Sequence, residues 1–291
     1  MRDAYIGIDL GTSGVRACAI DAAGNVLSET RASLPAPAHP CEGCHEQPAP
    51  LWWEATRAVL DDMLPNRRFS PRAISVDGTS GTLLLCDRAG TPLSPGLMYN
   101  DRRAVAEAAR LRPIAPPTAA VHSASSALAK LLYLQHALPR DTAHALHQAD
   151  WIAGKLSGNF SCSDENNALK LGYDPVKRCW PGWLQSSPVA HHLLPEVLPV
   201  GERSGMLRAE LGQRWQCRQA VAILAGTTDS NAATLASGIR QAGEASTALG
   251  STLVLKVLSE RPVYSAEDGI YSHRLGDRWL VGGASNSGGA V

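Results

Sequence analysis

One short pattern occurs twice in the sequence, once near its beginning and once near its end. Residues Leu10–Gly14 (Leu-Gly-Thr-Ser-Gly) and Leu249–Thr252 (Leu-Gly-Ser-Thr) both place glycine and hydroxyl side chains directly after a strand-like apolar segment. Another apolar segment follows each turn, which predicts two hairpins of one kind. A repeat over this distance favours two related domains that face each other, the first over residues 1–243 and the second beginning at 244–291.

The rest of the chain alternates between strand-like and helix-like patterns, which is typical of an α/β fold. Period-two alternation and short apolar runs predict strands at residues 4–9, 15–21, 26–33, 73–77, 82–86, 219–225, 253–258 and 279–284. A spacing near 3.6 predicts helices at residues 51–63, 104–111, 126–137, 149–156 and 231–239.

Composition restricts the class of protein. The 291 residues include 44% hydrophobic side chains, enough for a real core, and equal numbers (27 each) of basic and acidic residues. A formal net charge of zero gives no basis for binding nucleic acid or an anionic membrane. The chain enters a strand-like segment without a signal-peptide core, and no apolar run approaches the roughly 18–20 residues of a membrane span. We therefore expect a cytoplasmic protein; the sequence sets no oligomeric state.

Seven cysteines at irregular spacing argue against a disulfide framework. The segment Cys41–His45 (Cys-Glu-Gly-Cys-His) has the form of a c-type haem attachment site, but it lies in a proline-rich loop of a chain without an export signal. We interpret it as an ordinary loop rather than a haem or metal site, because short motifs need a supporting context. The scattered histidines show no metal-ligand spacing.

The two glycine-containing turns are candidate phosphate sites. Converging backbone N–H groups and hydroxyl side chains hold phosphate oxygens well, and glycine permits a close approach of the backbone. Either turn alone is typical of an ordinary hairpin, whereas two in corresponding places favour phosphate binding. The candidate residues are Gly11, Thr12 and Ser13 in the first turn and Gly250, Ser251 and Thr252 in the second.

Two aspartates follow strand-like segments directly. Asp9 ends the first strand, where a carboxylate can hold Mg²⁺ directly or through water; the alternative is a turn aspartate that bonds its own backbone. Asp229 follows Gly226-Thr-Thr at an expected strand-to-helix junction. It is either a helix-capping acid or a general base that accepts a proton from an attacking hydroxyl. Open α/β sheets place their ligands at such strand ends.

A third turn, Gly78–Gly81, contains Ser80. Its hydroxyl is a candidate contact for a sugar hydroxyl, and ordinary turn chemistry is the equally weighted alternative. The polar residues Asn100–Arg102 are similarly either ligand contacts or surface groups.

Together these motifs resemble those of the FGGY carbohydrate kinases of the actin/Hsp70/sugar-kinase superfamily. The similar segments are Ile6–Gly14 (first phosphate motif), Tyr99–Arg102 (W-N-D-x-R, with Tyr for Trp), Ala225–Ser230 (catalytic-base motif) and Leu249–Thr252 (second phosphate motif). The resemblance runs over the whole chain. Within the family, the chain is most similar to short cyanobacterial and plant sugar kinases proposed to act on D-ribulose, for example at Asp77–Asp87 and Tyr271–Leu275.

The resemblance implies the ribonuclease H-like α/β fold of sugar kinases, with a complete sugar-binding first domain and an incomplete nucleotide-binding second domain. It implies ATP and Mg²⁺ as cofactors and phosphorylation of a pentulose, with D-ribulose to D-ribulose 5-phosphate as the first choice. In this scheme sugar and ATP are the binding partners, Asp9 and Asp229 flank the reacting centre, and Ser80 touches the ketose. Further sugar contacts would come from Ser13, Gly14 and Arg16.

Three alternatives stay open. The xylulose-kinase segment Met-His-Gly is replaced by Gly78–Gly81, which argues against D-xylulose as first choice but leaves it, another ketose or a polyol as alternatives. The family's adenosine-binding Gly-Gly-Gly turn is absent from this sequence, so the chain is alternatively a fragment or a sugar-binding pseudokinase. An actin-like or chaperone ATPase fits less well, given the helical insert after Arg102. Each hypothesis in which the protein acts as a sugar kinase requires Asp9 and Asp229 to meet in one crevice.

Overall fold

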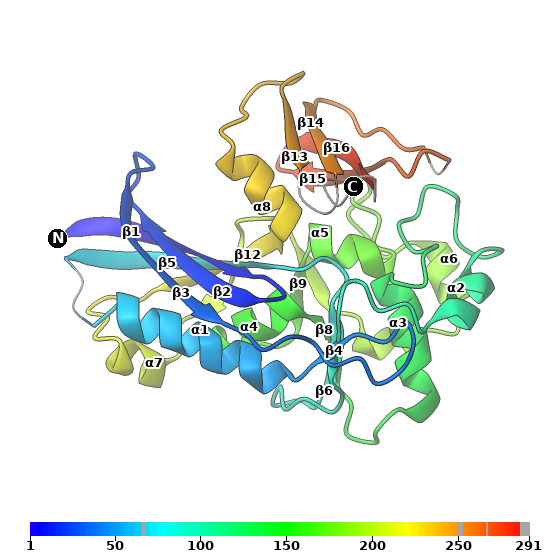
Figure 1. The fold of residues 1–291 in the computed structure, drawn as a ribbon, viewed down its shortest axis with the longest axis horizontal. Helices are drawn as coiled ribbons and strands as arrows, with labels where there is room; N and C mark the ends of the chain where they lie inside the picture. Colours follow the sequence, from blue (N-terminus) through cyan, green and yellow to red (C-terminus); the bar gives the residue numbers. More distant parts are fainter. Residues whose placement is uncertain (66–67, 250–252, 266, 286–291) are drawn as a thin grey trace.

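A six-stranded sheet organises the larger part of the chain, in the order β11-β12-β5-β1-β2-β3 (Figure 1). The structure is a computed structural model and describes residues 1–65, 68–249, 253–265 and 267–285. In the sheet, β1 pairs in parallel with β5, and β5 with β12, whereas β2, β3 and β11 are antiparallel to their neighbours. The strands are β1 (Arg2–Leu10), β2 (Gly14–Ile20), β3 (Val26–Ser33), β5 (Phe69–Gly78), β11 (Arg203–Met206) and β12 (Ala222–Thr228).

Helices and short turns connect and cover the strands. The helices are α1 (Ala49–Met63), α2 (Val105–Leu111), α3 (Ala127–Leu134), α4 (Gln148–Ser157), α5 (Glu165–Ala168), α6 (Gly182–Gln185), α7 (Ala209–Arg214) and α8 (Asp229–Ala236). Three 3-10 turns are η1 (Gln135–Ala137), η2 (Leu169–Leu171) and η3 (His191–Leu193). Among the described residues, no helix is both long and apolar enough to cross a membrane.

The two faces of the six-stranded sheet differ in what covers them. On one face, α1 packs on β2 and β3, and α4 packs on β5 and β12. Successive side chains of a strand point to opposite faces, so Ile6 and Ile8 join the apolar core with Trp52 of α1. By the same alternation Asp9 points to the other face, the side on which Figure 1 places α8.

A second apolar core lies beside this sheet. Strands β4 (Glu46–Gln47), β7 (Gly96–Leu97), β6 (Leu83–Cys86) and β8 (His144–His147) form a small sheet in that order. Leu83 and Leu85 of β6 are buried with Leu128 and Leu131 of α3. This core supports the turn that follows β5. A two-stranded pair, β9 (Cys162–Asp164) and β10 (Glu196–Leu198), joins the segments before α5 and after η3.

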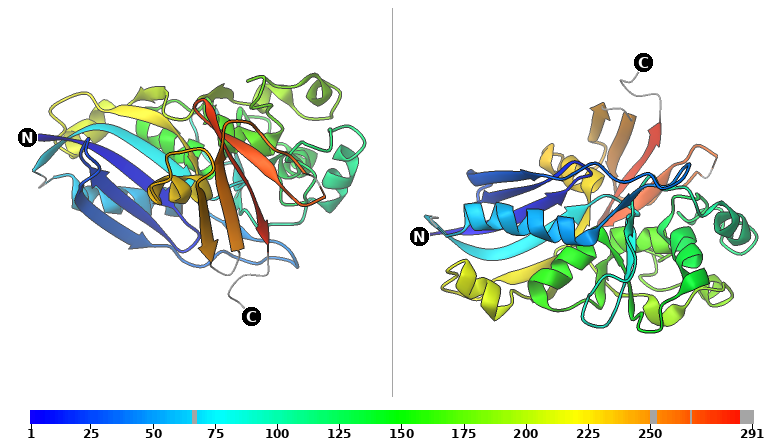
Figure 2. Two further views of the ribbon diagram at one scale, coloured as in Figure 1. Left: turned by 90° about the horizontal axis from the view of Figure 1, so that it is seen from above. Right: turned by 60° about the horizontal axis from the view of Figure 1, so that its bottom comes forward.

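The end of the chain forms a separate antiparallel sheet in the order β13-β14-β16-β15. Its strands are β13 (Ala245–Leu249), β14 (Leu253–Ser259), β15 (Tyr271–Leu275) and β16 (Arg278–Ser285). Both views of Figure 2 show this sheet standing apart from the six-stranded sheet, next to α8. β13 begins at Ala245, and a domain boundary near residue 243 stays a proposal. The β1–β2 and β13–β14 pairs are both antiparallel, as the repeated pattern predicts.

The predicted α/β fold is confirmed, with the first three strands and α1 close to their expected positions. Several boundaries differ from the prediction: β5 begins at Phe69 rather than residue 73, and β12 covers Ala222–Thr228 rather than 219–225. Asp229 is therefore the first residue of α8, which ends at Ala236 rather than residue 239. The extension of β12 follows from pairing, since Thr227 is opposite Asp77 and Thr228 opposite Gly78 of β5.

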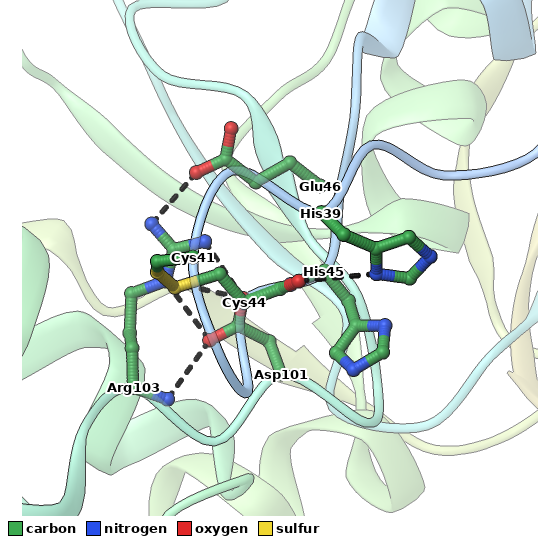
Figure 3. The surroundings of a disulfide bond; sticks show 7 residues. All are labelled: His39, Cys41, Cys44, His45, Glu46, Asp101 and Arg103. Carbon is green, nitrogen blue, oxygen red and sulfur yellow. Dashed lines mark hydrogen bonds and ion pairs between the residues drawn. A yellow bond between two sulfur atoms is a disulfide. The ribbon is translucent and has the colours of Figure 1, made fainter.

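The Cys41–Cys44 loop differs from the expectation of an ordinary loop, because these two cysteines form a disulfide (Figure 3). The loop is anchored to a neighbouring segment by Arg103, which pairs with Glu46 at 2.6 Å and Asp101 at 2.8 Å. The buried Asp101 also accepts a hydrogen bond from the backbone N–H of His45, at 2.7 Å. A bridge that closes so short a loop contributes about 2 kcal/mol or less to stability through chain entropy.

We predict that Gly226→Ala destabilises the protein, because a Cβ atom at this position would overlap the carbonyl oxygen of Val76 on β5. The backbone of β12 must then move, and we expect the free energy of unfolding to fall by about 1–3 kcal/mol in a denaturant titration. Gly7→Ala on β1 is the matched control, since a Cβ there has no heavy atom within 4 Å. Equal effects of the two substitutions would contradict the close approach of β12 to β5.

Candidate active site

Three aspartates lie at the carboxyl ends of three adjacent parallel strands. Asp9 on β1 is paired with Asp77 on β5, and Asp77 is paired on its other side with Thr227 of β12. Asp229 follows two residues later, at the start of α8. Asp9 and Asp229 are therefore brought to the same edge of the sheet. Open α/β sheets bind their ligands at this edge.

The three carboxylates influence one another electrostatically. Burial, followed by the charges of Asp9 and Asp229, raises the pKa of Asp77 to about 8. Burial also raises the pKa of Asp229 to about 6, with Asp9 adding to the rise. The backbone N–H of Ser230 opposes this second shift, because it donates a 2.7 Å hydrogen bond to the Asp229 carboxylate. Negative charge is thus concentrated at the sheet edge, which favours a cation or a proton there.

Within the described part of the chain, Asp9 pairs with one basic side chain. Arg16, its partner residue on β2, places Nη1 3.4 Å from the carboxylate. The two side chains are 76% and 39% exposed, respectively, and an exposed pair of this kind contributes little. Asp9 is therefore not neutralised by a buried basic partner. Together with Gly7 and Asp77, both residues line a cavity of about 740 Å³.

The first glycine-containing turn is less open to phosphate than the sequence suggested. The N–H of Gly11 donates to the carbonyl of Gly14 at 3.0 Å, so this donor is used within the turn. A Cβ at Gly14 would lie 2.7 Å from the carbonyl oxygen of Ala32, so the approach of β3 explains this glycine. The Ser13 side chain is exposed and Thr12 is half-buried. The second turn, Gly250–Thr252, lies outside the described residues.

The turn after β5 carries a hydroxyl group that has no hydrogen-bond partner among the described residues. Thr79 is fixed by Gln148 of α4, whose Oε1 accepts from the Thr79 backbone N–H at 3.2 Å and its hydroxyl at 2.9 Å. Ser80 follows at the same edge of the sheet as the three aspartates. Its Oγ is buried and has no hydrogen-bond partner among the described residues. A buried hydroxyl without a partner is costly, and a bound ligand would satisfy it.

A buried polar network ties the start of α8 to the β13–β16 sheet. Lys256 of β14 donates to Oδ1 of Asn231 at 3.1 Å and lies 2.9 Å from Nδ1 of His273 on β15. Asn231 in turn donates to the hydroxyl of Thr227 at 3.2 Å. The charge of Lys256 also lowers the pKa of Asp229, against the effect of burial.

Two members of this site were not predicted as site residues. Asp77 carries the same signal as Asp9, an apolar strand that ends in aspartate just before a glycine turn, and this signal was available in the sequence. Lys256 gave no comparable signal, since it lies within the apolar run of β14. Of the polar segment Asn100–Arg102, Asp101 is buried against Arg103 and has a structural role, whereas Arg102 is exposed.

The donor set at the sheet edge fits magnesium. Asp9 and Asp77 offer carboxylate oxygens, which are hard donors; burial raises the pKa of Asp77, and the charges of Asp9 and Asp229 add to the rise. The described residues contain no cluster of three or more His, Cys, Asp or Glu side chains arranged around a metal. Mg²⁺ commonly uses one or two carboxylates and completes its coordination with water and phosphate oxygens.

Comparison with known proteins finds relatives of this chain in one family. The profile of the N-terminal domain of the FGGY family of carbohydrate kinases matches residues 4–236. A xylulose kinase of Escherichia coli is 26% identical over 287 residues, which are 94% of this chain and 59% of that protein. A xylulose kinase of Streptomyces coelicolor is 28% identical over 281 residues, which are 88% of this chain and 54% of that protein.

Solved structures agree with this match. A Brucella ovis structure, described as a xyloylose kinase, superimposes with a TM-score of 0.90 at 26% identity, covering 98% of this chain and 61% of that one. A gluconate kinase of Lactobacillus acidophilus superimposes with a TM-score of 0.87 at 16% identity, covering 99% and 61%, which shows the shared fold alone. The chain therefore spans about three fifths of these relatives. None of the four names mentions D-ribulose, so the expected likeness to D-ribulose kinases is supported at the level of the family and not of the sugar.

We predict that Asp77→Asn stabilises the magnesium-free protein, and increasingly so at higher pH. An acid whose pKa is raised on folding makes the folded state less stable as pH rises from its unfolded value, about 4, to its folded value. Because that folded value is about 8 for Asp77, the gain over wild type should grow from pH 5 to pH 8. We expect about 1–3 kcal/mol at pH 8 in chemical unfolding with a chelator present.

The exposed Asp141→Asn is the control for this titration and should show no such trend. A stability difference between Asp77→Asn and wild type that is constant between pH 5 and pH 8 would contradict the raised pKa of Asp77.

Proposed function

Because the chain belongs to the FGGY family of carbohydrate kinases, we propose that it forms the sugar-binding part of an ATP-dependent kinase that phosphorylates a pentulose. D-ribulose, giving D-ribulose 5-phosphate, is the first choice. The observation that carries the proposal is the meeting of Asp9, Asp77 and Asp229 at one sheet edge. The buried, unpartnered hydroxyl of Ser80 at the same edge supports a polar ligand there.

In the proposed reaction Asp229 is the general base. With a pKa of about 6, its carboxylate is ionised at neutral pH and accepts the proton of a terminal ketose hydroxyl. The freed oxygen attacks the γ-phosphorus of ATP, the bond to the bridging oxygen breaks, and ADP leaves. The hydrogen bond from the Ser230 N–H holds one carboxylate oxygen in place. Such positioning supplies much of the rate in phosphoryl transfer.

Asp9 and Asp77 have a different role in the proposal, which is to hold the cation that accompanies ATP. Magnesium, when bound there, neutralises the charge that develops on the phosphates. The turn residues Gly11, Thr12 and Ser13, and in the second turn Gly250, Ser251 and Thr252, are proposed phosphate contacts. For Gly11 the contact would be by close approach rather than by its N–H, which is already used.

On the sugar side, Ser80 is the proposed principal contact, and Ser13, Gly14 and Arg16 are the further proposed contacts. D-ribulose and D-xylulose differ only in the configuration of one hydroxyl-bearing carbon, so a single hydrogen-bonding group can separate them. The Gly78–Gly81 turn supports D-ribulose through its resemblance to that group of kinases. The names of the relatives support D-xylulose as the alternative.

A second function is a sugar-binding module that does not transfer phosphate. The observation in its favour is that the N–H of Gly11 is already used within the first turn, which leaves that turn one donor fewer for phosphate. Isothermal titration calorimetry with D-ribulose, D-xylulose and MgATP separates the two functions. Binding of both a ketose and ATP supports the kinase, ketose binding alone supports the module, and failure to bind either ketose contradicts both.

We predict that Asp229→Ala lowers the rate of ketose-dependent ADP formation by at least about 10²-fold, because the loss of a general base costs about 10²–10⁴-fold. Ketose affinity, measured by calorimetry, should change little, and Asp141→Asn should remain active. In wild type, the apparent second-order rate should rise with pH through about 6, where Asp229 ionises. Activity retained in Asp229→Ala would exclude this residue as the base.

A further inference from the structure

Lys130 of α3 is completely buried, with no exposed surface. It lies on the same helix as Leu128 and Leu131, which belong to the second apolar core. Burying an ammonium group costs several kcal/mol unless good partners replace water. The cost is visible in the pKa of Lys130, which burial lowers to about 7. A side chain kept at such a cost requires a reason other than packing.

The partners of Lys130 are two main-chain carbonyl oxygens from distant segments. Its Nζ donates to the carbonyl of Gly81 at 2.8 Å and to that of Met98 at 2.6 Å. The Met98 carbonyl has a second donor, the N–H of Asp101 at 2.9 Å. Lys130 therefore joins the end of the turn after β5 to the segment that carries the buried Asp101.

The turn that Lys130 holds is the one that presents Ser80. Gly81 has a φ of +82°, in the left-handed region, so the backbone changes direction directly after Ser80. On the other side of Ser80, Gln148 fixes Thr79 by two hydrogen bonds. Ser80 is thus clamped between two buried side chains, Gln148 before it and Lys130 after it. Its own hydroxyl takes no part in the clamp, because Oγ has no partner among the described residues.

We propose that Lys130 is a positioning residue for the sugar substrate, which acts by holding the Gly78–Thr82 turn so that the Ser80 hydroxyl is presented to a ketose. The inference rests on the proposed function and deepens it by naming what sets the Ser80 contact. A purely structural role explains the lysine less well, because a hydrophobic residue of similar volume often matches or exceeds the stability of a buried charge.

The first test is Lys130→Met, which shortens the unbranched side chain by one heavy atom and removes its donors. We expect the dissociation constant for the ketose, measured by calorimetry with D-ribulose and with D-xylulose, to rise at least about tenfold, or about 1.4 kcal/mol. Leu131→Ala, on the same helix, is the control: it should lower the melting temperature and leave ketose affinity within about twofold. Unchanged affinity in Lys130→Met would overturn the proposal.

A double-mutant cycle shows whether Lys130 acts through Ser80. If it does, Ser80→Ala with Lys130→Met should bind the ketose no more weakly than Ser80→Ala alone, since there is no hydroxyl left to position. Fully additive losses would show that Lys130 affects binding by another route and would overturn the proposed link.

Amide hydrogen exchange separates failure of this inference from failure of the proposed function, because it needs no ligand. Lys130→Met should speed exchange in a peptide covering residues 79–82 and leave β1 and β5 unchanged. If wild type binds neither ketose, the proposed function fails, and faster exchange at 79–82 would still support the clamp. Unchanged exchange at 79–82 would overturn the positioning role, whatever the ketose result.

Discussion

The parallel register of β1, β5 and β12 is the constraint on which the candidate site depends. It pairs Asp9 with Asp77 and brings Thr227, two residues before Asp229, to the other side of Asp77. A slip of one residue would turn every side chain of a strand to the opposite face. The apolar face of β1, with Ile6 and Ile8 in the core, makes such a slip costly. Burial of the apolar side chains of β1 thereby fixes the strand register, and the register places the aspartates at the edge of the sheet.

Aspartates gathered at one sheet edge lower the stability of the folded protein and favour the binding of a positively charged ligand there. Burial raises the pKa values of Asp77 and Asp229, like charges at the same sheet edge add to the rise, and the exposed contact with Arg16 does little to offset them. Perturbed acids gathered at one place are typical of functional sites, where a ligand supplies the missing positive charge or takes up the proton.

The fold was predictable where the local pattern was strong. The alternation of β1 to β3 and their glycine turns specify the first three strands, whereas β9 and β11 are too short to show a period. In the site, Asp9 and Asp229 were predictable from aspartate at a strand end. Asp77 gave the same signal, but in the sequence its segment was interpreted through Ser80 alone. Lys130 was not predictable, because its partners lie 49 and 32 residues away and are backbone carbonyls without a sequence signature.

The groups proposed to act on the substrate are held by polar contacts more than by packing. Lys256 reaches across from β14 to Asn231, and Asn231 bonds Thr227, which fixes the start of α8 where Asp229 lies. Hydrogen bonds have preferred lengths and angles, whereas apolar contacts are non-directional. A catalytic carboxylate must be placed to within a fraction of an ångström. Directional contacts from buried side chains meet that requirement on a helix that few apolar side chains anchor, since Leu235 of α8 is itself exposed.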